Sequence, residues 1–159
     1  QHYQREIPGG ELISYCENAA VNAVLLYFAQ EAKLREIAFE VRVNLPKETG
    51  MEETDLSVLF GNLLENAVDA VKDLLPEHKP YVKMLTKVKS RKLLIEISNP
   101  YSNEIQRREK VFYSTKHEGF GIGTASVAEV VQRMGGYVVF NTEEGIFKVN
   151  IFLPVKTVQ

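Results

Sequence analysis

Two pairs of strand-like segments, each pair joined by a short polar turn, restrict the folds available to this chain. Residues 81–88 (YVKMLTKV) and 92–98 (KLLIEIS) flank the tripeptide KSR, and residues 137–141 (YVVFN) and 146–154 (IFKVNIFLP) flank Glu144-Gly145. Their β-branched and aromatic content and the polar turns between them are typical of antiparallel hairpins. We therefore expect two hairpins in the fold.

Three segments have apolar residues at helical spacing. They are residues 11–35, residues 55–75, which stop at Pro76, and residues 124–134, which Gly135-Gly136 would cap. The expected apolar face of the first helix comprises Ile13, Cys16, Ala20, Ala23, Val24, Tyr27 and Phe28. The expected buried face of the second comprises Leu56, Leu59, Phe60, Leu63, Leu64, Ala67, Val71 and Leu74.

A further strand is expected in residues 37–46, where Phe39, Val41, Val43 and Leu45 alternate with polar residues. Residues 99–118 between the second hairpin strand and the last helix show no clean period and are expected to form a functional lid or a long loop. The order of elements predicts an α+β fold in which a mixed sheet carries its helices on one face.

Composition places the chain among ordinary soluble domains. It has 159 residues, 45% of them hydrophobic and 25% charged, and a formal net charge of -2, which argues against binding nucleic acid by bulk electrostatics. One cysteine excludes an intrachain disulfide, and no apolar run reaches the ~18 residues of a membrane span. Because the chain starts without methionine, we interpret residues 1–10 as a linker from an upstream region and residues 11–159 as the domain.

The second helix carries an unusual polar row. Asn62, Asn66 and Asp69 follow one another at i, i+4 and i+7, so they lie on one ridge of the helix. Such a ridge presents several oxygen acceptors in one direction, and Mg²⁺ prefers hard oxygen ligands. A polar seam at the solvent edge is the alternative for any single asparagine. Asn18 and Asn22 repeat the spacing without a following acid, and we assign them no chemistry.

Three glycines, Gly119, Gly121 and Gly123, come directly before the third helix. Glycine allows a ligand to approach the backbone, and a helix N-terminus attracts phosphate through its free N–H groups. The spacing does not fit a Walker loop or a protein-kinase loop. A Rossmann fingerprint fits imperfectly, although Glu143 lies near the distance expected for a ribose-binding acid. A glycine-rich hinge without a ligand is the remaining alternative.

Taken together, the segments NLLENAVDA and GFGIGTASVAEVVQRMGG resemble the N box and the second glycine box of the ATP-binding catalytic domain of sensor histidine kinases, within the GHKL superfamily. The subgroup it is most similar to is the peptide quorum-sensing kinases of Gram-positive bacteria, of the accessory-gene-regulator and VirS type. The resemblance covers about residues 14–154. It implies the Bergerat fold, a two-layer α/β sandwich with a mixed, mostly antiparallel sheet.

The resemblance also implies roles for single residues. Asn66 would be the Mg²⁺ ligand, and Asn62 would lie beside the phosphates, in the place where ATP-hydrolysing relatives have a glutamate base. Because asparagine cannot accept a proton there, we do not expect rapid hydrolysis. Asp69 would be a phosphate-side group. The lid and phosphate cradle would consist of Ser114, Thr115, Lys116, Gly119, Gly121, Gly123 and Thr124.

Two positions depart from the family pattern. The adenine motif D-x-G-x-G is replaced by SNPYSN, so Asn99 is the candidate acceptor for the purine amino group, with weaker binding expected than for an aspartate. The last glycine box, at EEGIFKVN, lacks the threonine that usually follows its glycine.

The implied activity is that of a histidine kinase that uses ATP and Mg²⁺, and the implied partners lie outside this sequence. They are the upstream dimerisation and phosphoacceptor helices of a homodimeric protein and a cognate response regulator. The histidines His2, His78 and His117 do not fit the acceptor pattern, so this chain alone is not expected to phosphorylate itself. The resemblance further implies a cytoplasmic domain of a membrane-anchored sensor, with no direct membrane contact of its own.

Two other functions remain open at this point. The altered adenine motif would also suit a nucleotide-sensing or protein-interaction module that has kept the fold and lost the chemistry. The glycines together with Glu143 would suit a dinucleotide-binding oxidoreductase.

Overall fold

A computed structural model describes residues 5–6, 13–101 and 122–155 of the chain. Its main sheet has five strands in the order β3-β4-β5-β7-β6. The strands are β3 (Ala38–Val43), β4 (Tyr81–Lys89), β5 (Lys92–Pro100), β6 (Tyr137–Glu143) and β7 (Ile146–Pro154). Strands β3 and β4 pair in parallel, and the other neighbours pair antiparallel.

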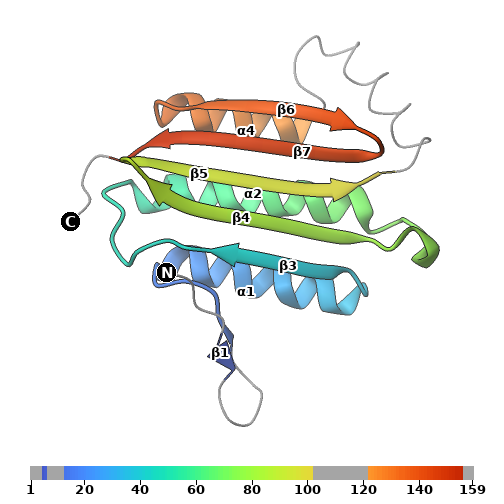
Figure 1. Cartoon of the computed structure of the whole chain (residues 1–159). Helices are drawn as coiled ribbons and strands as arrows, with labels where there is room; N and C mark the ends of the chain where they lie inside the picture. The colour runs from blue at the N-terminus through green and yellow to red at the C-terminus, as the bar shows by residue number, and fades with distance from the viewer. Residues whose placement is uncertain (1–4, 7–12, 102–121, 156–159) are drawn as a thin grey trace.

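The helices α1 (Ala19–Leu34), α2 (Glu53–Val71) and α4 (Ile122–Arg133) cover one face of this sheet (Figure 1). A short 3-10 helix, η1 (Pro76–His78), leads from α2 into β4, and β1 (Arg5–Glu6) pairs with β2 (Ile13–Ser14) as a separate two-stranded sheet. The predicted fold class, a two-layer sandwich with helices on one face of a mixed, mostly antiparallel sheet, is confirmed.

Both predicted hairpins are present, and local backbone conformation explains their turns. Ser90 and Arg91 between β4 and β5 have positive φ angles of 54° and 63°, and Glu144 and Gly145 between β6 and β7 have 54° and 78°. Two consecutive residues with positive φ form the turn whose twist matches that of antiparallel strands. The parallel pair β3-β4 cannot be joined so tightly, and α2 provides the crossover between its strands.

Helix α2 buries the face that its spacing predicted. Seven of the eight predicted positions, from Leu56 to Val71, are buried. Leu74 is only partly buried because the helix ends at Val71, four residues before the predicted end. At the other end, the Glu52 carboxylate accepts a hydrogen bond from the Asp55 N–H at 3.0 Å, which caps the helix start.

The predicted start of the first helix is wrong, and its predicted apolar face is confirmed only in part, because Val24 and Phe28 pack against the core but Tyr27 does not. The Asn18 side chain accepts from the Val21 N–H and begins α1 at Ala19, while Asn22 Oδ1 accepts from the Tyr15 N–H at 2.7 Å and holds the preceding segment outside the helix. Local side-chain bonds of this kind compete with helix formation. Helix α1 buries Val21, Leu25 and Ala32, whereas Tyr27, predicted to face inward, is 60% exposed.

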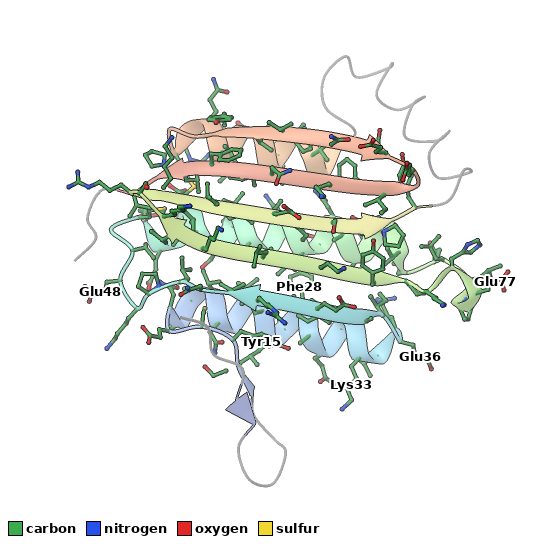
Figure 2. The ribbon with its side chains drawn as sticks, viewed as in Figure 1. Tyr15, Phe28, Lys33, Glu36, Glu48 and Glu77 are labelled. Carbon is green, nitrogen blue, oxygen red and sulfur yellow. The ribbon has the colours of Figure 1, made fainter. Side chains whose placement is uncertain are left out.

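Tyr15 enters the core between α1 and β3 and meets the Phe39 ring edge-on at a centroid distance of 6.1 Å (Figure 2). Figure 2 also marks the two ends of the sheet, because Glu48 lies in the β3-α2 connection and Glu77 lies on η1 at the opposite end. The carboxyl end of β5, where the site lies, is at the same end of the sheet as Glu77, as the element labels of Figure 1 and the residue labels of Figure 2 show in the same view.

One core hydroxyl lies in an unfavourable place. Thr86 on β4 is 1% exposed, and its Oγ1 has no hydrogen-bond partner among the described residues. A buried polar group without a partner costs about 1–3 kcal/mol, and an apolar side chain of the same shape avoids this cost. We expect Thr86→Val to raise the free energy of unfolding in urea by about 1 kcal/mol. Thr142→Val, at an exposed position of β6, should change it by less than about 0.5 kcal/mol; equal effects would contradict this account.

Candidate functional site

The candidate site is built on helices α2 and α4, which run antiparallel beside each other. The Arg133 guanidinium near the end of α4 pairs with the Asp55 carboxylate near the start of α2 at 3.0 Å. Further along, Asn62 Nδ2 donates to Ser126 Oγ at 3.0 Å. These two contacts place the N-terminal turn of α4 next to the second half of α2, where Asn66 lies.

Asn66, Asn99 and Thr124 border a single pocket although they come from α2, β5 and α4. The remaining lining is apolar: Leu63, Ala67, Ile97, Val127, Phe140, Phe147 and Val149. A mostly apolar pocket with a few convergent polar groups is the usual form of a small-molecule site. Three of the residues predicted from sequence therefore lie together at one place in the fold.

The pocket is nearly closed in this conformation. Its cavity volume is about 10 Å³, which is about the space that one water molecule needs. The Phe140 ring on β6 and the Phe147 ring on β7 both line the pocket. The two rings are stacked, with a distance of 6.2 Å between their centroids and an interplanar angle of 11°. A purine base needs much more room, so the lining side chains must separate before a base can enter.

The position of the Asn99 side chain follows from the alternation of side chains between the two faces of β5. Leu93, Ile95 and Ile97 face the helices, and Asn99 is the next residue on that side. It is 2% exposed, and its Nδ2 donates to the Pro100 carbonyl at 2.9 Å. Phe147 lies directly opposite Asn99 on β7, so the pocket begins where the apolar row of β5 ends in an amide.

Asn62 lies one turn before Asn66 and is tied to α4 through Ser126. The sequence did not single out Ser126. The signal available for it was its position in the first turns of the helix that follows the glycines. In this bond Ser126 Oγ accepts from Nδ2, so the Asn62 Oδ1 is the end of the amide that the bond does not use.

Asp69, the third member of the predicted row, does not border the pocket. Its carboxylate pairs with Lys72 Nζ at 3.3 Å, and its side chain is 57% exposed. An ion pair this exposed contributes little to stability. The phosphate-side role of Asp69 stays a prediction.

The predicted phosphate cradle falls only partly within the structure. Gly123 and Thr124 belong to the first turn of α4. The other predicted members, Ser114, Thr115, Lys116, Gly119 and Gly121, lie outside the described residues.

Other classes of site find no support in the described part of the chain. No group of three or more His, Cys, Asp or Glu side chains is arranged there to hold a metal ion. None of the described helices combines the length and apolarity that crossing a membrane requires. Glu143 lies exposed at the end of β6, and β5 is antiparallel to both neighbours. This sheet is therefore not the parallel sheet of a dinucleotide-binding fold.

Cys16 is a structural thiol rather than a nucleophile. It is 4% exposed, and burial raises the pKa of the thiol from 9.0 to about 11, so little thiolate exists at neutral pH. The unfolded chain loses this proton at lower pH than the folded chain does. The stability gained from burying the neutral thiol is complete below pH 9.0 and is lost as the pH rises towards about 11.

This description of Cys16 predicts slow modification. We expect a thiol reagent to label native protein at neutral pH far more slowly than urea-unfolded protein, measured by absorbance of the released chromophore. Equal labelling rates would show that the thiol is accessible in the folded state.

These observations define a class of two-layer domain that has a mostly apolar pocket, with three polar side chains, between α2, α4 and the end of β5. A family profile described as the GHKL domain matches residues 51–154 of the 159-residue chain. The chain therefore belongs to the GHKL domain family. A search of curated proteins finds no match.

Several solved histidine kinase domains share this fold. The catalytic domain of the histidine kinase ThkA, in a nucleotide-free form, superposes with a TM-score of 0.64 at 15% identity, over 86% of this chain and 90% of that one. The histidine kinase AdeS of Acinetobacter baumannii gives 0.63 at 16% identity, over 87% of this chain and 64% of that one. The histidine kinase domain of the blue-light activated kinase EL346 of Erythrobacter litoralis gives 0.56 at 18% identity, over 83% and 61%.

Proposed function

We propose that this chain is the ATP- and Mg²⁺-binding catalytic domain of a sensor histidine kinase, which delivers the γ-phosphate of ATP to a histidine on an upstream domain. The observation that carries the proposal is the convergence of Asn66, Asn99 and Thr124 on one pocket. Membership of the GHKL family and the fold shared with histidine kinase domains support it.

The proposed roles follow from the chemistry of each side chain. Asn66 supplies an amide oxygen to Mg²⁺, and such a ligand adds no net negative charge beside the phosphates. Asn99 accepts from the amino group of the base. Gly123 and Thr124 offer the N-terminal N–H groups of α4 to the polyphosphate, where the helix dipole favours negative charge. Mg²⁺ bound there would neutralise phosphate charge in the transfer.

Asn62 makes the site better suited to transfer than to hydrolysis. A general base at this position would have to accept a proton from water, and an amide cannot do so. The side-chain nitrogen of Asn62 also donates a hydrogen bond to Ser126 Oγ. We therefore expect slow ATP hydrolysis by this domain, so that the bound nucleotide survives until an acceptor histidine arrives.

The acceptor and the other partners belong to the full-length protein in this proposal. Among the described residues the only histidine is His78, which is exposed on η1, and the sequence around the chain's three histidines does not resemble the acceptor pattern of the family. We propose upstream phosphoacceptor helices in a homodimer, a cognate response regulator, and membrane anchoring outside this domain. The resemblance of residues 14–154 to the peptide quorum-sensing subgroup supports a kinase of that type.

Calorimetric titration with ATP and Mg²⁺ tests the proposal directly. We expect one site per chain, with binding that weakens when EDTA removes the metal. A titration without heat change, supported by an absence of nucleotide-induced thermal stabilisation, would contradict the proposal.

A nucleotide-sensing or protein-interaction module without catalysis is the second candidate, and the altered adenine motif favours it. The two functions differ in phosphate transfer. Incubation with labelled ATP and a separately supplied acceptor-helix domain should label the acceptor if the domain is a kinase. Nucleotide binding without any labelling of the acceptor would favour the sensing module.

A further inference from the structure

The main sheet has one face that none of the described helices covers, and Figure 2 looks onto this open face. Along β4 the buried Val82, Met84 and Thr86 face the helices, so the residues that alternate with them lie on the open face. The cross-strand register places their neighbours on β3, β5, β7 and β6. The side chains that lie together on the open face can therefore be named.

An apolar patch lies on the open face at the end of the sheet where β4 turns into β5, opposite to the end that holds the pocket. Tyr137 is directly opposite Phe152, which is directly opposite Leu94, and the two rings stack with 4.8 Å between their centroids. Leu85 lies diagonal to Leu94, and Val139 is the next open-face residue after Tyr137. Tyr137, Leu85 and Val139 are 58%, 46% and 45% exposed. Contiguous apolar patches on a protein surface often mark interaction sites.

Four basic side chains border the apolar patch on the same face: Arg42, Lys87, Lys89 and Lys92. The first two are directly opposite leucines of the patch, and Lys89 is directly opposite Lys92. Like charges in such a cross-strand pair destabilise a sheet. All four side chains are exposed, and within the described part of the chain none of them forms an ion pair.

The lysines nearer the pocket end of the open face are neutralised by acids. Lys83 Nζ lies 3.7 Å from a carboxylate oxygen of Glu40, and Lys148 Nζ lies 3.6 Å from one of Glu96. The same face therefore pairs its cations at one end and leaves them unpaired around the apolar patch at the other. The unpaired cations are available to an anion outside the chain.

We propose that the apolar patch and its four basic neighbours dock on an anionic membrane surface. Lysine and arginine carry their charge at the end of a long apolar stem, so the charges can reach lipid phosphates while the patch enters the headgroup region. Tyrosine is favourable at this boundary, and an anionic lipid surface attracts nearby basic residues. A soluble acidic partner would complement the cations alone, whereas a lipid surface complements the basic rim and the apolar centre together.

This membrane contact would be additional to the anchoring proposed outside the domain, and the family resemblance does not imply it. The pocket lies on the other face of the sheet, because Asn66 and Thr124 belong to helices that cover that face. Docking through the open face would therefore keep α2 and α4 away from the membrane. The proposal does not rest on the proposed function, and nucleotide plays no part in its test.

Cosedimentation with lipid vesicles tests the proposal. The native chain should bind vesicles made of equal parts phosphatidylglycerol and phosphatidylcholine, bind vesicles of phosphatidylcholine alone much more weakly, and dissociate as the salt concentration rises. A variant that combines Lys87→Gln, Lys89→Gln and Lys92→Gln should bind the anionic vesicles about a hundredfold more weakly. Failure of the native chain to bind anionic vesicles, or equal binding to both kinds of vesicle, would overturn the proposal.

The matched control changes the net charge by the same amount at exposed positions on the helices or at their ends. It combines Lys33→Gln, Lys72→Gln and Lys79→Gln. This variant should bind anionic vesicles nearly as the native chain does. Equal weakening in the two triple variants would show that net charge and not the open face governs binding, which would overturn the proposal. The lipid and salt dependence of the native chain keeps the test decisive if a variant does not fold.

Leu85→Thr combined with Val139→Thr tests the apolar part of the surface. Both positions are exposed on strands, and threonine is favourable in strands, so the fold should be kept. This variant should bind anionic vesicles about tenfold more weakly, and should bind polyglutamate, a soluble polyanion, as weakly as the native chain does. Unchanged binding to vesicles would overturn docking through the patch. If polyglutamate bound the native chain as tightly as the vesicles do, the partner would be an acidic protein and the membrane proposal would be wrong.

Discussion

Asn66→Ala is expected to lower the affinity for Mg²⁺-ATP by about a hundredfold while leaving the metal-free affinity nearly unchanged. Asn66 borders the pocket on the α2 side, and the proposed function gives it the metal. Alanine is a good helix former, so the variant should keep α2 intact. Titration calorimetry with and without EDTA separates the two affinities.

Asn141→Ala is the matched control, because it removes an asparagine amide from an exposed position of β6 outside the pocket. It should bind Mg²⁺-ATP as the native chain does. If Asn66→Ala and Asn141→Ala bound equally well, Asn66 would not be the metal ligand. If Asn66→Ala weakened binding equally with and without metal, its role would lie with the nucleotide rather than the metal.

Gly136→Ala is expected to destabilise the fold by about 3 kcal/mol, the largest stability change predicted for this chain. Gly136 joins α4 to β6, and its N–H bonds to the Val131 carbonyl at 3.0 Å. A Cβ at this position would collide with the main-chain oxygen of Phe152 and lie 2.6 Å from Leu153 Cδ2. Because the first of these atoms is backbone in β7, the strand itself must shift. Urea unfolding at equilibrium measures the loss.

Gly61→Ala controls for the general effect of replacing a glycine. Gly61 lies inside α2, and a Cβ added there would meet nothing within 4 Å. Alanine should stabilise the helix by about 0.5–1 kcal/mol. Destabilisation of both variants by similar amounts would contradict the structural explanation of Gly136.

The parts of the fold that depend on local chemistry could be predicted from the sequence. Turn pairs such as Glu144-Gly145 favour the same backbone conformation wherever they occur. Gly135, which follows the C-terminal end of α4, has a φ of 82°, as expected of a glycine that caps a helix. The apolar period of α2 was also clear because its opposite face is polar.

Helix α1 could not be predicted as well, for two physical reasons. Apolar residues surround most of the helix, so its spacing did not show which stripe, that of Val21 and Leu25 or that of Tyr27, would face the sheet. Its start depends on bonds from Asn18 and Asn22 side chains to the main chain. The spacing of apolar residues gives no information about such hydrogen bonds, so the predicted helix begins too early in the sequence.

Some residues of the candidate site could likewise be predicted from the sequence, and others could not. Asn66 could be found because it lies in a polar row on an otherwise apolar helix, and Asn99 because it stands where the family resemblance places the adenine motif. Phe140 and Phe147 could not, since their contact with the pocket depends on the register of β6 and β7 against β5. The bond from Asn62 to Ser126 joins residues 64 positions apart in sequence and depends on the packing of α4 against α2.

The central claim is that the carboxamides of α2 and the N-terminal amides of α4 bind the same polyphosphate. The most direct test is ¹H–¹⁵N correlation NMR during a titration with Mg²⁺ and a non-hydrolysable ATP analogue. The account predicts that the side-chain amides of Asn62 and Asn66 and the backbone amides of Gly123 and Thr124 shift together, with one common dissociation constant. Shifts confined to one helix, or two sets of shifts that saturate at different nucleotide concentrations, would contradict it.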